Sequence, residues 1–420
     1  MYYAEVARAP LADRRVILLA LLAAGCSGNL NPIRPRPLGQ DSSVLLDSSV
    51  LEDASSAPDS LVPVVCPDKL IGYATMSNQG GEPDGSVPPM PLLDGGVTGG
   101  ADGAIVVVDA RDSNALLDFA MYATDKTPGP LTILVKGMIS IPPTRDGGDT
   151  GGEQIRVSAN KTVIGADAHS GLLGGGLAMT RVSNVIVRNL TIGRPNANGA
   201  IDAIHIEGSH QIWIDHCDLS SNGPTPDAGA SYDDLVGISD KSDFVTISWT
   251  HYHDHEDSGL IGRSDSSDAA AEDMNKDHVT YDHDLFTNLR TGPRTRFGTI
   301  HILNTYFDHI ANYGVAATDG AHVRIEGSVF YNVAPPVQPH ANFGPVTTIL
   351  DSPATAGYVD LVSNVIDPAD GNGPNVIPAT QVVPWAPPYP YKDSADSAAS
   401  AAYVVPHCVG PGHIAVPPTN

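Results

Sequence analysis

Three arginines surround a proline in RTGPRTRFG, residues 290–298, within a strongly acidic chain. Arg290, Arg294 and Arg296 come from only 23 basic residues, whereas the chain has 48 acidic residues and a formal net charge of −25. The planar guanidinium group can hold a carboxylate or a phosphate through two parallel hydrogen bonds. A solvated basic turn is the simpler explanation. We interpret the cluster as a binding site for a ligand rich in such anions.

The acidic composition narrows the class of ligand. Nucleic acid requires a broad basic face, so a pI near 4.7 predicts no nucleic-acid partner. An acidic polymer is also repelled by the net charge of the protein. Its binding therefore requires local cations, either the arginine cluster, a metal ion or both.

The arginines lie within a repeat that must position them. Seven segments have apolar residues at places one and three, polar residues in the middle and an apolar residue at place seven or eight, which predicts a strand, a corner and a second short strand. The units begin 21 to 36 residues apart, too short for the four-stranded blade of a propeller, and they lack the hairpin turns of a sandwich. We predict an all-β solenoid, a parallel β-helix. The segments are VIVRNLTI (from 185), IWIDHCDL (212), VTISWTHY (245), VTYDHDLF (279), IHILNTYF (300), VRIEGSVF (323) and VDLVSNVI (359).

Two further features belong to this fold. Residues 112–123, DSNALLDFAMYA, have helical spacing and predict a short N-terminal cap, which solenoids need. Asn189 and Asn304 fall at the same polar corner of the repeat, where we expect side-chain amides to stack from rung to rung.

The first residues have the pattern of an export signal. Arg14 and Arg15 precede VILLALLAAG, an apolar run too short to span a bilayer. Cys26 directly after Ala-Ala-Gly resembles a bacterial lipobox, which predicts a lipid-anchored surface protein; ordinary secretion is the alternative. The predicted parts are a signal peptide (1–26), a disordered low-complexity tether (27–64), the β-helix (65–410) and a tail (411–420). We expect a monomer.

Export permits disulfides. Cys66 opens the predicted folded part and Cys408 nearly closes it, so a bridge between them would join its ends. Cys217 lies inside an apolar strand and is expected to be a buried free thiol. The cysteine spacing does not indicate a zinc site.

The order of several motifs resembles bacterial pectate lyases of polysaccharide lyase family 1. The resemblance runs from about residue 66 to 358 and implies a right-handed parallel β-helix that cleaves polygalacturonate or pectin by β-elimination, usually with calcium. The motifs are CPDKLIGYAT, GVTGG, NKTVIGA, NVIVRNLTIG, IWIDHCDLS, FVTISW, HDHEDSGLIG and PRTRFGTIHILNTYF.

Elimination explains why arginines would gather. The reaction removes the C5 proton of a uronate ring and expels the C4 oxygen. Positive charge on the neighbouring carboxylate stabilises the enolate-like transition state, and calcium or arginine can supply it. The resemblance implies an arginine as the base, which requires that its pKa be lowered, because a guanidinium normally stays protonated.

Only some of the family's calcium ligands have counterparts in this chain. Asp202 and Asp233 match two ligands of the family, whereas Gly237 stands at the third carboxylate position. Asp234 or Asp240 can replace it, although neither lies at the expected step. We predict a metal site of Asp202, Asp233 and Asp234, with weak or substrate-dependent calcium binding.

The arginine motif also departs from the family pattern. Alignment on the proline puts Thr291 at the position of the base and leaves Arg290 one residue early, while Asp257 stands where a substrate-binding lysine is expected. We predict Arg290 and Arg296 as catalytic, with a local bulge, which Gly292 permits, bringing Arg290 into place. Arg294 and Arg296 are the predicted substrate-binding residues.

These departures leave three functions open. The first is a calcium-dependent lyase, and the second is a calcium-independent pectin lyase, because neutral methyl esters need less charge compensation. The third is a non-catalytic surface lipoprotein that binds acidic polysaccharide.

Other polar residues are also candidates. His251, His253 and His255 alternate along one segment and form a possible metal site, although the family uses this segment structurally. Asp215 and His216 look like a catalytic dyad, but we expect them to hold the rung. The remaining expectations are packing roles for Trp213 and Trp249 and a solvated acidic loop at 265–277 that lines the site.

Overall fold

The computed structural model describes residues 64–77, 90–91, 96–142, 154–195, 201–221, 233–333, 344–348, 355–367 and 385–418. The chain divides into residues 1–45, none of which is described, and residues 46–420, which hold every described element. The predicted signal peptide and the predicted tether up to residue 63 lie outside the described residues. Within the described part, no helix is long and apolar enough to cross a membrane.

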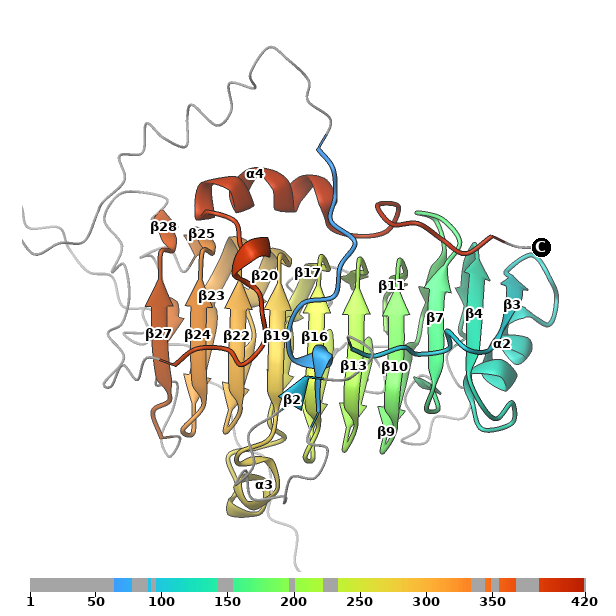
Figure 1. Ribbon diagram of the computed structural model, residues 1–420, viewed down its shortest axis with the longest axis horizontal. Coiled ribbons are helices and arrows are strands. Elements are labelled where there is room, and N and C mark those ends of the chain that lie inside the picture. Colours follow the sequence, from blue (N-terminus) through green and yellow to red (C-terminus); the bar gives the residue numbers. More distant parts are fainter. Residues whose placement is uncertain are drawn as a thin grey trace, which may run out of the picture. The chain divides into compact units, whose positions relative to one another are not determined.

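Parallel strands from successive units stand side by side in a ten-stranded sheet (Figure 1). From β4 onward, each strand pairs with its counterpart one repeat away and not with the next strand in sequence, which is the connectivity of a solenoid. The strands are β3 (Ala104–Asp109), β4 (Leu131–Lys136), β7 (Lys161–Gly165), β10 (Ser183–Arg188), β13 (His210–Asp215), β16 (Asp243–Ser248), β19 (His278–Asp282), β22 (Thr299–Leu303), β24 (His322–Glu326) and β27 (Tyr358–Val362).

A second sheet of sixteen strands has two arms that meet in the long strand β23 (Tyr306–Thr318). The first arm contains β5 (Met138–Ser140), β8 (Gly171–Leu173), β11 (Thr191–Gly193), β14 (Asp218–Ser220), β17 (His251–Asp257), β20 (Leu285–Thr291), β25 (Val329–Val333) and β28 (Val365–Asp367). The second arm contains β6 (Gln154–Arg156), β9 (Gly176–Thr180), β12 (Ile204–Glu207), β15 (Val236–Ser239), β18 (Gly259–Ile261), β21 (Arg294–Arg296) and β26 (Gly344–Thr347). A turn of the chain such as β12, β13 and β14 therefore visits both arms and the ten-stranded sheet, which confirms the predicted parallel β-helix.

The template found in the sequence sets the register of the ten-stranded sheet. The first residues of all seven segments pair in one continuous row: Val185, Ile212, Val245, Val279, Ile300, Val323 and Val359. All of them are buried, because alternate residues of each strand face the interior.

The fifth place of every template segment is the corner. Its residue has a positive φ in each of the seven cases, a conformation that turns the chain sharply and costs energy in any residue but glycine. The corner residues are Asn189, His216, Trp249, His283, Asn304, Gly327 and Ser363.

The expected amide stack between Asn189 and Asn304 does not form, because three aromatic corners separate them. His216 and His283 instead stack on either side of Trp249, with ring centroids 6.0 and 4.3 Å away. Each asparagine donates from Nδ2 to a backbone carbonyl of a neighbouring rung, at Gly165 and Gly327.

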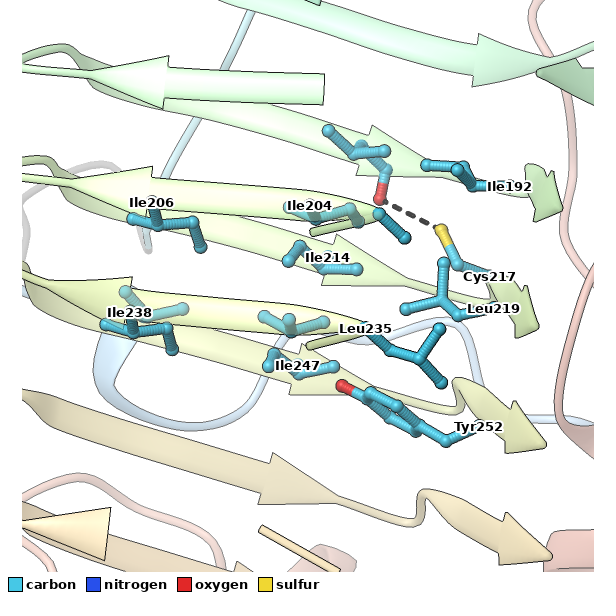
Figure 2. Packing of buried hydrophobic residues seen from close by; sticks show 14 of the residues in the cluster. Ile192, Ile204, Ile206, Ile214, Cys217, Leu219, Leu235, Ile238, Ile247 and Tyr252 are labelled. Atoms are coloured by element: carbon cyan, nitrogen blue, oxygen red, sulfur yellow. Dashed lines mark hydrogen bonds between the residues drawn. The ribbon is translucent and has the colours of Figure 1, made fainter. Parts of the chain in front are cut away.

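Aliphatic side chains from all three strand rows fill the interior. Figure 2 shows Cys217 among Ile192, Leu219 and other apolar residues of successive turns. Its thiol donates to the carbonyl of Val187, and burial raises the pKa of Cys217 to about 12. The prediction of a buried free thiol is confirmed.

Helices and short segments cover the solenoid. Helix α2 (Ala115–Ala123) packs Phe119 against the core beside β3 and β4, which confirms the predicted N-terminal cap. Helix α4 (Ala398–Cys408) carries the cysteine that forms the disulfide Cys66–Cys408. The other short elements are α3 (Ser267–Asp273), η1 (Tyr73–Thr75), η3 (Lys392–Ser394) and the antiparallel pair β1 (Met76–Ser77) and β2 (Met90–Pro91).

Candidate active site

The arginine stretch forms the end of β20, a turn and the whole of β21. A Cβ added to Gly292 in the turn would lie 1.7 Å from the carbonyl oxygen of Gly314 on β23, so only glycine fits there. The pairing with β23 is irregular beside Arg290: Leu289 pairs with Ile310, but Thr291 pairs with Tyr313. The extra residue of this irregularity therefore lies on β23, opposite Arg290.

Arg294 and Arg296 share one carboxylate. Asp265 Oδ1 accepts a hydrogen bond from Arg294 Nη2 at 2.9 Å and another from Arg296 Nε. Arg296 is only 6% exposed and also donates from Nη1 to the carbonyl of Gly262 at 2.9 Å. Burial, together with the positive charge of Arg294, lowers the pKa of Arg296. The surroundings of Arg296 therefore favour release of its proton.

Asp265 was not identified from the sequence as a site residue. It belongs to the acidic segment that we expected to be a solvated loop, of which residues 267–273 instead form α3. Burial opposes its charge, but Arg296 and Arg294 outweigh burial and lower the pKa of the Asp265 carboxyl. Its place in the sequence carries no motif, because the contact depends on how the chain folds back after β18.

Arg290 is held separately by two acids. Its Nη2 lies 2.5 Å from Asp257 Oδ2, and its Nε lies 2.9 Å from Glu256 Oε1. Thr291 donates from Oγ1 to the other oxygen of Asp257 at 2.7 Å. The acid that stands in place of the expected lysine therefore binds both the predicted catalytic arginine and the threonine at the aligned base position.

The three predicted metal ligands lie together. Asp202 precedes β12, Asp233 and Asp234 precede the neighbouring strand β15, and ligand atoms of the three carboxylates lie within 4.8 Å of one another. Burial and the charge of Asp202 raise the pKa of Asp233 and of Asp234. Such mutual repulsion is what a bound cation relieves, and carboxylate oxygens are the ligands that calcium prefers. The residues present fit a calcium ion.

The structure explains the missing carboxylate at position 237. A Cβ on Gly237 would lie 2.3 Å from Asp202 Oδ2, so the Asp202 carboxylate occupies the space that a side chain there would need. His205, which was not identified from the sequence, lies with its Nδ1 2.6 Å from the same oxygen and orients it. The hydrogen bond to Asp202 raises the pKa of His205.

The three carboxylates lie on the same face of the second arm as Arg294 and Arg296. His205, Gly237, Leu260 and Arg294 pair in one row across β12, β15, β18 and β21. The charge of Arg296 also lowers the pKa of Asp234, although burial and the neighbouring aspartates raise it more. We call this surface, from Asp202 to Arg296, the arginine–carboxylate face.

The other candidates from the sequence lie elsewhere. His255 is buried, with Nε2 2.6 Å from the carbonyl of Asp233, whereas His251 and His253 stand beside Asp218. The three histidines therefore do not form one site, because Asp254 adopts a positive φ and breaks the alternation.

Asp215, His216 and the two tryptophans have structural roles, as expected. Asp215 accepts from His216 and Arg188, and the Arg188 guanidinium lies 4.2 Å from the ring centroid of Trp213. Both tryptophans are buried.

Comparisons with known proteins agree with this geometry. Residues 92–366 match the family described as "Pectate lyase". The chain is 38% identical over 298 residues to pectate lyase plyB of Emericella nidulans, covering 70% of this chain and 79% of that protein. It is 32% identical over 336 residues to a pectate trisaccharide-lyase of Bacillus licheniformis, covering 79% and 88%.

A solved structure of a Bacillus pectate lyase in complex with trigalacturonate has a similar fold. It superimposes with a TM-score of 0.65 at 26% identity and covers 82% of this chain and 99% of its own. The match to the family covers more than half of the chain, and the relatives are aligned over most of their length. The chain therefore belongs to the pectate lyase family and is a polysaccharide lyase.

Proposed function

We propose that the arginine–carboxylate face binds polygalacturonate and cleaves it by β-elimination to unsaturated oligouronides. The observation that carries this proposal is the row from His205 to Arg294, which puts three clustered carboxylates and two arginines on one side of the second arm. Arginines that hold carboxylates beside a calcium-type site are what a polyuronate substrate requires.

Asp202, Asp233 and Asp234 would hold a calcium ion, which supplies positive charge to a uronate carboxylate. The clustering of these carboxylates supports a calcium-dependent lyase over the calcium-independent alternative. Among the residues that the structure describes, three carboxylate side chains cluster here, and Asp202 also contacts His205, so we expect substrate carboxylates to complete the coordination. We therefore propose weak calcium binding by the free protein and tighter binding when polygalacturonate is present.

Arg296 and Arg294 would grip the uronate carboxylate. The Asp265 carboxylate lies where we place the uronate carboxylate, because it already accepts hydrogen bonds from both arginines. A substrate carboxylate that replaces Asp265 receives the same donors, with Arg296 held in place by the carbonyl of Gly262. Contacts that bind the substrate and the transition state equally do not speed the reaction. These hydrogen bonds contribute to catalysis because they strengthen as negative charge develops on the carboxylate.

Arg290 would act at the C5 proton, together with Arg296. Glu256 and Asp257 both form ion pairs with the Arg290 guanidinium in the free chain. For Arg290 to accept a proton, the substrate must therefore separate it from these acids. The turnover of an Arg290 variant is therefore the direct test of this role.

The test measures unsaturated uronide, by its ultraviolet absorbance, on polygalacturonate and on methyl-esterified pectin, each with calcium and with a chelator. We expect product from polygalacturonate that disappears with the chelator. Equal activity on pectin in chelator supports the calcium-independent alternative, and absence of product from both polymers overturns the proposal.

We further propose that the protein is exported and anchored through Cys26. The supporting observations are the lipobox-like sequence around Cys26 and the disulfide Cys66–Cys408, a bond typical of oxidising compartments. Mass spectrometry of the mature N-terminus tests this, with Cys26→Ser as the variant that should lose any lipid. An unprocessed N-terminus contradicts it.

A further inference from the structure

A second group of metal-binding side chains lies outside the arginine–carboxylate face. Asp218 on β14 and His251 and His253 on β17 belong to neighbouring parallel strands of the first arm, where Asp218 pairs with His251. The three side chains are 26%, 24% and 23% exposed, so each is mostly covered but open to solvent on one side.

The distances within this group fit a single small ion. Asp218 Oδ2 lies 3.2 Å from His253 Nε2 and 3.6 Å from His251 Nδ1, and ligand atoms of the three residues lie within 4.8 Å of one another. Donors held about 2.0–2.1 Å from a tetrahedral zinc are separated from one another by roughly 3.3 Å. Both measured distances lie close to that separation, so small side-chain rotations bring the donors to bonding distance.

The ring nitrogens that face away from Asp218 have partners of their own. His251 Nε2 lies 2.8 Å from Thr287 Oγ1, and His253 Nδ1 lies 2.9 Å from Asp254 Oδ2. Asp254 is itself fixed by a hydrogen bond from Asn288 Nδ2. Metal-binding histidines characteristically donate the other ring N–H to a carboxylate or a similar acceptor, which fixes the orientation of the ring.

Packing fixes the two rings relative to each other. The imidazoles of His251 and His253 are stacked with centroids 4.3 Å apart and planes 24° from parallel. Both therefore present one nitrogen to the same carboxylate oxygen without a change in backbone conformation. Because the rings are stacked, an ion in the plane of both requires the side chains to rotate out of the stack, while the backbone stays as it is.

We propose that Asp218, His251 and His253 form a binding site for a divalent first-row transition metal, with zinc as the ion that fits best. Two imidazole nitrogens and one carboxylate oxygen are a zinc-type ligand set with an open fourth position, whereas calcium prefers oxygen ligands alone. The site is separate from the carboxylates of Asp202, Asp233 and Asp234. A bound ion links β14 to β17 and so joins two successive turns of the solenoid.

The experiment is a calorimetric titration of zinc into the full chain in excess calcium, which occupies the other site. We expect one equivalent of zinc and an unfolding temperature that rises with zinc concentration. His253→Gln and Asp218→Asn should each weaken binding by more than 100-fold, and Asp254→Asn by about 10–100-fold through the orientation of His253. His309→Gln is the matched control, because His309 pairs with its neighbour Asp308 on β23, outside the proposed site.

X-ray absorption of the zinc-loaded wild-type chain gives a readout that needs no variant, and it should show two imidazoles per metal. The proposal fails if the wild-type chain binds no zinc in excess calcium, if the absorption spectrum shows oxygen ligands only, or if His253→Gln and Asp218→Asn bind zinc as the control does.

Discussion

Arg290 and Asp257 form a direct ion pair, with Nη2 and Oδ2 2.5 Å apart, between the ends of β20 and β17. The resemblance to the family implies a lysine where Asp257 stands, so this chain has an acid in contact with its predicted catalytic arginine. The pair connects two departures from the family pattern that are 33 residues apart in the sequence. It also gives Arg290 a position that the sequence alone leaves open.

Arg290→Ala should lower turnover by about 10²–10⁴-fold, the range for loss of a group that moves a proton, while polymer binding is retained. Unsaturated product and affinity electrophoresis in polygalacturonate measure the two effects. Arg111→Ala is a control, because Arg111 is an exposed arginine paired with Asp109 beyond the end of β3. A variant as active as the parent shows that Arg290 does not act at C5.

Arg296→Lys should lower kcat/KM by about 10²-fold although the charge is kept, because lysine cannot reproduce the donors that reach Asp265 and Gly262 together. The rate of product release under subsaturating polygalacturonate measures this. Arg111→Lys should behave like the parent. Full activity of the Arg296 variant would place the carboxylate grip elsewhere.

Gly237→Asp restores the carboxylate that the family pattern implies, yet it should not strengthen calcium binding. The new Cβ would meet Asp202 Oδ2 at 2.3 Å and displace a proposed ligand. Calorimetry with calcium, in the presence and absence of oligogalacturonate, compares this variant with Asp233→Asn, which should also weaken binding. Tighter binding by the Gly237 variant contradicts our assignment of Asp202.

His283 should make stability depend on pH in the alkaline range. Burial disfavours its charge, but Asp282 and Asp396 outweigh burial and raise the pKa of His283 to about 9. Because the folded-state pKa is raised, this contribution is complete below the unfolded value of about 6.5 and is lost as pH rises through about 9. The shift corresponds to on the order of 3 kcal/mol.

Urea unfolding of the parent and of His283→Gln at pH 6 to 10 tests the pH effect. The parent should lose stability over this interval, and the variant should be less stable at pH 6 and flatter in its response. Parallel curves would show that His283 is not the group responsible.

Cys66→Ser combined with Cys408→Ser should lower the free energy of unfolding by roughly 2–5 kcal/mol. The bond joins residues 342 apart in sequence and ties the N-terminal segment to α4, whose side chains pack on Trp249. Denaturant unfolding measures the change, and Cys217→Ser is not a suitable control because Cys217 is fully buried. A double variant that is as stable as the parent contradicts this prediction.

The fold was predictable because apolar alternation carries the information that sets strand register. Val185 and Val359 lie at the ends of a row that the seven-fold template aligns correctly. The composition of the carboxylate cluster was predictable, since Asp234 was proposed as the third ligand and lies with Asp202 and Asp233. The contacts of Asp265 and Glu256 were not predictable, because the first depends on the path of a loop and the second on the register between β17 and β20.

The corner at the fifth template position has a consequence for how this protein can change in length. In all seven units two residues, the first with a positive φ, join the ten-stranded sheet to the next short strand, so that junction has a constant length. The variation in the spacing between units, from 21 to 36 residues, therefore arises entirely from the lengths of the other junctions. Insertions there, such as the one that contains α3, leave the pairing row intact. The solenoid can thus acquire or lose whole loops beside its arginines without a change in strand register.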